Sequence, residues 1–173
     1  ALVDHFQIEE YDLLLSYGTS VIVPGWILDK PDLMAVNLHA ASPQYPGRDP
    51  HHFAVYDEAT QYGATLHFMT EHVDAGPIID VELFDVPDGV RPIDLLDKGI
   101  EAAYRLLKKY LMTFLSSNTP PSNPDLAWTG KKRSRKDFLE LCRIDAGISE
   151  EEFKRPQSAY QMPGYDNLYI EIY

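Results

Sequence analysis

The amino-acid sequence predicts an α/β fold with a mostly parallel sheet. Two short apolar runs, Tyr11–Gly18 ("YDLLLSYG") and Leu33–His39 ("LMAVNLH"), are typical of strands that are buried on both faces. A long stretch from Arg91 to Leu115 places apolar residues at helical spacing. With 173 residues, 45% of them hydrophobic, the chain can bury one core and carry a small appendage.

The connections and the later strands follow from local pattern. Residues 22–31 ("IVPGWILDKP") predict a loop and a short helix between the two apolar runs. Residues 49–59 ("DPHHFAVYDEA") predict a helix beginning near Asp49 or Pro50, because Asp is a favoured N-cap and Pro suits the first turn. Residues 62–70 ("YGATLHFMT") alternate as a strand does, and residues 76–86 ("GPIIDVELFDV") predict a strand pair or one long bent strand.

The long helix closes the main body. Its predicted buried stripe contains Ile93, Leu96, Ile100, Ala103, Leu107, Tyr110 and Leu111. After Leu115 the composition changes to a Pro, Ser and Asn-rich segment that cannot continue a helix. We therefore predict a partial catalytic core over 1–115, a linker over 116–126 and a C-terminal appendage over 127–173.

The appendage is predicted to hold three short elements. Residues 135–144 ("RKDFLELCRI") predict a helix, residues 149–153 ("SEEEF") predict the start of another, and residues 168–173 ("LYIEIY") predict a closing strand. A segment of this size is too small to be stable alone.

The charge of the chain argues against nucleic acid as a partner. The formal net charge is −12 and the sequence pI is about 4.8, so a broad electrostatic contact with nucleic acid is not expected. One basic run interrupts the acidity, at Lys131–Lys136 ("KKRSRK"). Runs of this kind are more often a solvated, flexible surface than a binding site, and we interpret it in that way.

The sequence also predicts a compartment and disfavours metal. The lone Cys142 cannot form an intrachain disulfide, no apolar run approaches ~18 residues, and no signal pattern is present. We expect a cytoplasmic protein with no membrane association. His51, His52 and His67 lack the carboxylate spacing of a metal site, so we interpret them as polar surface or substrate contacts and expect no metal.

Three polar residues stand where ligands bind in open α/β sheets. Asn37 and His39 alternate along one predicted strand and therefore share a face, at the strand end that borders the ligand crevice. Asp74 follows a later strand and precedes small residues that allow a tight loop. An amide, an imidazole and a carboxylate are suited to acyl transfer to an amine. Asn37 would stabilise an oxyanion, His39 would move or stabilise protons, and Asp74 would orient His39 and relay the amine's proton.

At these residues the sequence resembles a known family. "VNLHAASPQYPG" followed by "YGATLHFMTEHVDAGPII" is similar to the folate-dependent formyltransferases, over about residues 11–79 and more weakly through the long helix. The resemblance implies a Rossmann-like formyltransferase fold and a catalytic set that matches Asn37, His39 and Asp74. It also implies 10-formyltetrahydrofolate as the formyl donor.

The resemblance further implies how the folate would be held. The family binds the pterin ring largely through main-chain groups of two loops. These match Val21, Ile22 and Val23 in the first loop and Met69, Thr70, Glu71 and Val73 in the second. Simple core packing of Val21–Val23 is compatible with the same pattern.

Two departures from the family pattern affect these expectations. The loop after His39 is "AASPQYPG", one residue shorter than the usual loop, so its path is open. Members usually carry several strand–helix units before the strand at Tyr11–Gly18, and this chain starts almost at that strand. The fold is therefore expected to lack its first strand–helix units, as a fragment, as a trimmed variant, or with another chain or a second copy completing the sheet.

The acceptor is predicted from weaker features. The tail after residue 126, with Trp128, basic residues and a late tyrosine-rich segment, is more similar to the sugar-nucleotide formyltransferases, and the acidity disfavours tRNA. We therefore favour an amino sugar attached to a nucleoside diphosphate. Trp128, Tyr160 and Tyr165 are candidates for stacking on its base, although plain core packing is the more common role of such residues. Alternatives are glycinamide ribonucleotide or methionyl-tRNA as acceptor, hydrolysis of formyltetrahydrofolate, and a non-catalytic folate-binding fragment.

Overall fold

The computed structural model describes residues 2–116 and 118–171. The main body contains, in chain order, α1 (Leu2–Ile8), β1 (Leu13–Tyr17), α2 (Gly25–Leu28), β2 (Met34–His39), α3 (Pro50–Tyr56), β3 (Gln61–Phe68), β4 (Ile78–Asp85) and α4 (Pro92–Leu115). The tail adds α5 (Arg135–Cys142) and α6 (Glu150–Tyr160). No helix in these two ranges is long and apolar enough to cross a membrane.

The predicted α/β class is confirmed, and the sheet is mixed. Four strands lie in the order β1-β2-β3-β4. β1 and β2 are parallel, as their apolar runs predict, and β3 and β4 join antiparallel. The segment 76–86 thus contains one strand, β4, which is joined to β3 by the loop over residues 69–77 and needs no crossover helix.

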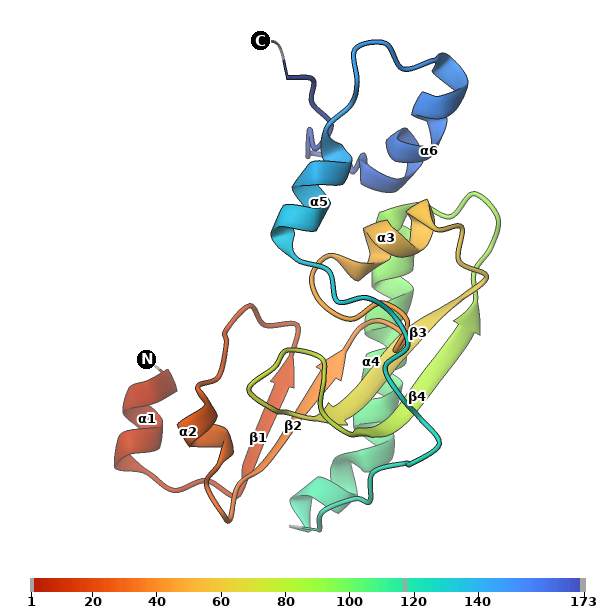
Figure 1. The fold of residues 1–173 in the computed structure, drawn as a ribbon. Coiled ribbons are helices and arrows are strands. Elements are labelled where there is room, and N and C mark those ends of the chain that lie inside the picture. Colours follow the sequence, from red (N-terminus) through yellow and green to blue (C-terminus); the bar gives the residue numbers. More distant parts are fainter. Residues whose placement is uncertain (1, 117, 172–173) are drawn as a thin grey trace.

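The long helix α4 packs along one face of the sheet (Figure 1). Ala103 of the predicted stripe is buried, but the rest of the buried face differs from that stripe and contains Leu95, Gly99, Ala102, Leu106 and Phe114. Ile100 and Leu111 are each 41% exposed instead. Small residues determine which face of α4 turns toward the sheet. A Cβ at Gly99 would lie 2.7 Å from the Ala40 carbonyl oxygen, so only glycine allows the helix to come this close to the end of β2.

The tail returns to the main body. From the end of α4 it runs back past the sheet to α5 and α6, which gather beside α3 (Figure 1). Phe138, Cys142 and Tyr160 share one buried cluster with Phe53 and Tyr62 of the main body. The proposed division at residues 115 and 127 stays a prediction, but the appendage does not have a core of its own among these residues.

Local signals explain most of the tail. Ser149 and Glu152 form a capping box at the start of α6, and Ser134 and Asp137 do the same for α5. The predicted closing strand is not observed: within 168–171 one isolated bridge joins Tyr169 to Arg143, and residues 172–173 lie outside the described range. Asp49 precedes α3 but does not cap it, because its backbone is left-handed (φ 54°) and its carboxylate pairs with arginines.

Candidate active site

A cavity of about 680 Å³ opens at the carboxyl ends of β1 and β2. This is the edge at which open α/β sheets hold ligands. Ser16 lines it from β1, Asn37 and His39 line it from β2, and His67 lines it from β3. Asp74 reaches it from the loop between β3 and β4.

Strand register places these side chains together. Asn37 lies opposite His67, and His39 lies opposite Thr65. Side chains of a strand alternate between faces, so Val36 and Leu38 pack under α4 while Asn37 and His39 face the cavity. The predicted shared face of Asn37 and His39 is thus observed.

Of the two interpretations of His67, polar surface or substrate contact, its burial in the cavity wall excludes the first, and the second stays a prediction. His67 is 2% exposed, and its Nδ1 lies 2.8 Å from the Phe68 carbonyl oxygen. A carbonyl only accepts, so Nδ1 carries the proton and Nε2 of a neutral ring accepts from the Asn37 amide, 3.1 Å away. Its pairing opposite Asn37 requires the β2–β3 register, which one sequence does not reveal.

Asp74 is fixed from three sides. Its Oδ2 accepts a hydrogen bond of 2.8 Å from the Gly47 N–H and lies 3.5 Å from His39 Nδ1, and its Oδ1 lies 3.5 Å from His67 Nε2. Burial alone would raise the pKa of Asp74, but the positive charge that His67 and His39 carry in their protonated forms and the hydrogen bond from the Gly47 N–H outweigh it, so the pKa is lowered below its usual value. The residue is left-handed (φ 47°), a conformation that Asp tolerates better than most residues do.

His39 is oriented for accepting a proton at one atom. Its Nε2 lies 2.9 Å from the Tyr45 carbonyl oxygen, which can only accept, so Nε2 carries the proton. The lone pair of the neutral ring is then on Nδ1, facing Asp74. Burial lowers the pKa of His39 below its usual value, although Asp74 and Tyr45 act against this shift. The ring is therefore neutral at pH 7 and can act as a base whose charged form Asp74 would stabilise.

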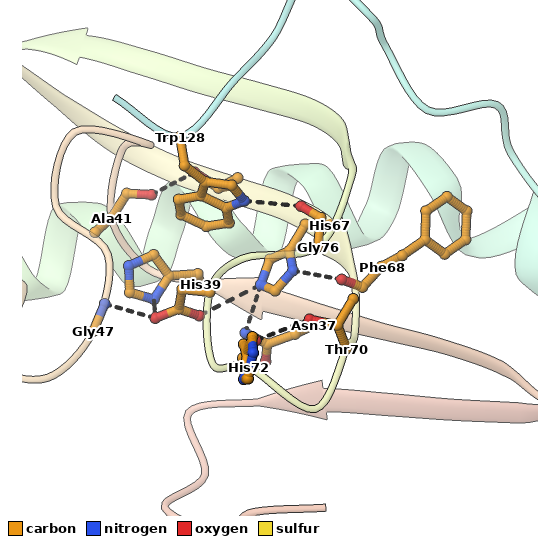
Figure 2. Close-up of polar contacts among 12 residues, drawn as sticks. Asn37, His39, Ala41, Gly47, His67, Phe68, Thr70, His72, Gly76 and Trp128 are labelled. Atoms are coloured by element: carbon orange, nitrogen blue, oxygen red, sulfur yellow. Dashed lines mark hydrogen bonds and ion pairs between the residues drawn. The ribbon is translucent and has the colours of Figure 1, made fainter. Parts of the chain in front are cut away.

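Trp128 of the tail covers both histidines. Its ring meets His67 edge-on at 5.0 Å and His39 at 5.9 Å between centroids, and its Nε1 donates to the Gly76 carbonyl oxygen at 2.8 Å (Figure 2). For Trp128, Tyr160 and Tyr165 the sequence leaves two interpretations, stacking on a base and plain core packing. Tyr160 is fully buried in the core, which excludes stacking on a base, whereas Tyr165 is 64% exposed.

The two loops expected to hold the pterin ring form one side of the cavity. Val21, Ile22, Val23, Met69, Thr70, Glu71 and Val73 all line it. Val21 and Ile22 are 54% and 66% exposed, so core packing does not explain them. An apolar slot with nearby main-chain groups suits a flat heterocycle.

Another part of the cavity wall contains residues that the sequence leaves as polar surface or substrate contacts, and a basic run interpreted as solvated surface. His51 and His52 are buried, at 8% and 4% exposure, because α3 packs against α6, and His52 Nδ1 donates to the Ala159 carbonyl oxygen. Of the basic run, Lys132, Arg133 and Arg135 line the cavity. In residues 2–116 and 118–171 no group of three His, Cys, Asp or Glu side chains is placed to hold a metal ion.

The α/β fold and this polar set beside an apolar slot define a group-transfer type of site. The family model for formyl transferase matches residues 1–110. A methionyl-tRNA formyltransferase of Listeria monocytogenes serotype 4a (strain HCC23) is 31% identical over 129 residues, which is 73% of this chain and 41% of the relative. The chain belongs to the formyl transferase family.

Solved structures share the fold across the tail as well. A 4-N formyltransferase from Francisella tularensis superposes with a TM-score of 0.82 at 24% identity, covering 98% of this chain and 70% of that one. An N-formyltransferase from Helicobacter canadensis, in complex with folinic acid and dTDP-3-aminofucose, gives a TM-score of 0.73 at 18% identity, covering 99% and 62%. The chain spans about two fifths of the length of the curated relative above.

Proposed function

We propose that this chain transfers a formyl group from 10-formyltetrahydrofolate to a primary amine of a nucleotide-linked amino sugar. The observation that carries the transfer step is the convergence of Asn37, His39 and Asp74 on one cavity that also has an apolar slot. Family membership and folate ligands in structural neighbours support the donor.

Each polar group has a role in this reaction. Asn37 has two amide N–H groups, and His67 accepts one, which leaves the other for the formyl oxygen as negative charge grows on it. His39 Nδ1 takes the proton from the attacking amine, and Asp74 stabilises the resulting imidazolium. The same proton is delivered to the departing folate nitrogen, so the amine gains the formyl group and the folate gains a hydrogen.

The proposed acceptor is argued from the net charge of the chain and from its C-terminal segment. A net charge of −12 is unfavourable for tRNA, whose backbone needs a broad basic face. A sugar N-formyltransferase structure from Shewanella covers 98% of this chain, including α5 and α6, at a TM-score of 0.82. Methionyl-tRNA is the competing candidate for the acceptor, because curated relatives are named methionyl-tRNA formyltransferases.

Incubation with 10-formyltetrahydrofolate, with and without dTDP- or UDP-linked amino sugars, tests the proposal. We expect acceptor-dependent loss of the formyl group and a formylated sugar by mass spectrometry. Formyl loss without acceptor would indicate a hydrolase, binding without loss would indicate a folate-binding protein, and transfer to methionyl-tRNA or glycinamide ribonucleotide alone would reassign the acceptor. Asp74→Asn provides the inactive control.

A further inference from the structure

The cavity has a cationic end that the transfer chemistry leaves unused. Arg48, Lys132, Arg133 and Arg135 line it together with Asp49 and His51. Four cations beside one carboxylate contrast with a chain whose net charge is −12. In Figure 1 the connection leading to α2 lies on the β1 side of the sheet, and the start of α5 lies on the α3 side. The chain segments that carry the cationic end and the apolar slot thus approach the cavity from different sides of the sheet.

Backbone pairing fixes this end of the cavity. The Arg48 N–H donates to the Arg133 carbonyl oxygen at 2.9 Å, and the Arg133 N–H donates to the Pro46 carbonyl oxygen at 3.0 Å. A Cβ at Gly47 would lie 2.2 Å from the Arg133 carbonyl oxygen, so glycine is required for this approach. The basic run is therefore not a loose surface segment at Arg133.

Side-chain contacts fix the positions of the arginines at this end of the cavity, whereas Lys132 has no such contact. Asp49 Oδ2 lies 3.4 Å from Arg48 and 3.5 Å from Arg135, and the Arg133 guanidinium lies 5.0 Å over the Phe53 ring. Lys132 makes no hydrogen bond or ion pair with any residue in the described part of the chain. Arg48 and Arg135 are fixed by Asp49, whereas the Lys132 ammonium is available to a ligand. Such a set of cations is suited to bind an anion with several acceptor oxygens.

A buried histidine beside these cations lacks a partner. His51 is 8% exposed, and its Nδ1 is buried with no hydrogen-bond partner in the described residues. Burial, and secondly His52, lower the pKa of His51 to about 3, so the ring is neutral at pH 7 and offers a hydrogen bond, not a charge. Unpaired buried polar atoms are uncommon and need a reason, and a ligand in the same cavity supplies one.

We propose that Arg48, Lys132, Arg135 and His51 form the subsite for the phosphate groups of the acceptor. This inference rests on the proposed function, because it gives the nucleoside diphosphate a place across the catalytic set from the folate slot. The amine of the attached sugar would then approach His39 and Asp74 from the tail side. The glutamyl carboxylates of folate are the other anion that could occupy such a subsite.

The test measures binding of dTDP, UDP and 5-formyltetrahydrofolate by calorimetry to the full chain, to Lys132→Ala and to Lys136→Ala. Lys136 belongs to the same basic run, but its side chain is 86% exposed and does not line the cavity. We expect Lys132→Ala to weaken nucleoside diphosphate binding about 10-fold, as loss of a charge-assisted hydrogen bond does. Lys136→Ala should leave it within about 2-fold, and folate binding should be unchanged in both variants.

Several results would overturn the subsite. If Lys132→Ala and Lys136→Ala weaken nucleotide binding equally, the effect is one of general surface charge and not of a subsite. If Lys132→Ala weakens binding of 5-formyltetrahydrofolate, the cations bind the glutamyl tail of folate instead. Binding of methionyl-tRNA with no binding of either nucleotide would also contradict it. If the unmodified chain binds folate but neither nucleotide nor tRNA, the subsite fails while formyl transfer stands; if it binds no folate, the proposed function itself fails.

Discussion

The strand side of the cavity (β2, β3 and residues 70–76) and its tail side (residues 127–135) are held in place by different means. On the strand side, sheet register sets Asn37 opposite His67, and the same pairing buries Leu38 behind them. On the tail side, position depends on glycine contacts between distant segments: a Cβ at Gly130 would lie 1.6 Å from the Gln44 carbonyl oxygen. We therefore expect changes on the strand side to affect chemistry, and changes on the tail side to affect placement.

The largest effect is expected from removing the proton-transfer pair. His39→Ala and Asp74→Asn should each lower turnover by about 10²–10⁴-fold, the range for loss of a general acid or base. Both side chains face the cavity, so a soluble, folded protein is expected. Single-turnover formyl transfer, with melting temperature measured on the same samples, checks this; near-normal rates in a folded variant would remove the assignment.

The next largest effect is expected at Asn37, and it tests whether the side-chain amide stabilises the oxyanion. Asn37→Ala should lower turnover by about 10²–10³-fold while weakening folate affinity much less, because the hydrogen bond strengthens as charge grows on the formyl oxygen. Asn37→Asp should be at least as damaging, since a carboxylate repels that charge. If Asn37 only ties β2 to His67, melting temperature and folate binding would fall together and turnover per folded molecule would be unchanged.

The contrast between the strand side and the tail side also explains which site residues could be predicted from the sequence. Asn37 and His39 lie two apart on a strand, and Asp74 lies in a loop of recognisable composition, so local pattern and family resemblance suffice to name them. His67 needs the register between two strands, and Trp128 needs the return path of a segment more than fifty residues after Gly76. The buried face of α4 was mispredicted because small residues, not large ones, determine how closely it approaches the sheet.

The tail side should show an intermediate effect. Trp128→Ala removes the ring that packs against His39 and His67 and the hydrogen bond to Gly76, so turnover should fall about 10–100-fold, as small misplacements of catalytic groups do. Trp128→Phe keeps a ring and should lose less. Trp26→Ala, a tryptophan 46% exposed on α2, is the matched control. A Trp128→Ala protein as active as the Trp26→Ala protein would show that the tail does not position the site.

The smallest effect concerns how the stability of the protein depends on pH. Burial lowers the pKa of His51 to about 3, and burial also lowers the pKa values of His52 and His39. Their unfolded value is about 6.5, so as pH falls below 6.5 the unfolded chain binds protons that the folded chain excludes. The free energy of unfolding should therefore fall with decreasing pH, by up to about 1.4 kcal/mol per pH unit for each histidine.

Urea unfolding at pH 7.5, 6.0 and 5.0 measures this slope. His51→Gln should reduce the slope, because it removes one group that titrates between pH 6.5 and about 3, whatever it does to stability at pH 7.5. His72→Gln makes the same substitution at a histidine whose side chain is 72% exposed and is measured alongside as the control. Asp74, with its lowered pKa, contributes only at lower pH, because its stabilisation is present above about 3.8 and is lost as pH falls through its folded pKa. Equal slopes in the His51→Gln protein and the unchanged protein would mean that burial in α3 does not hold the His51 ring neutral.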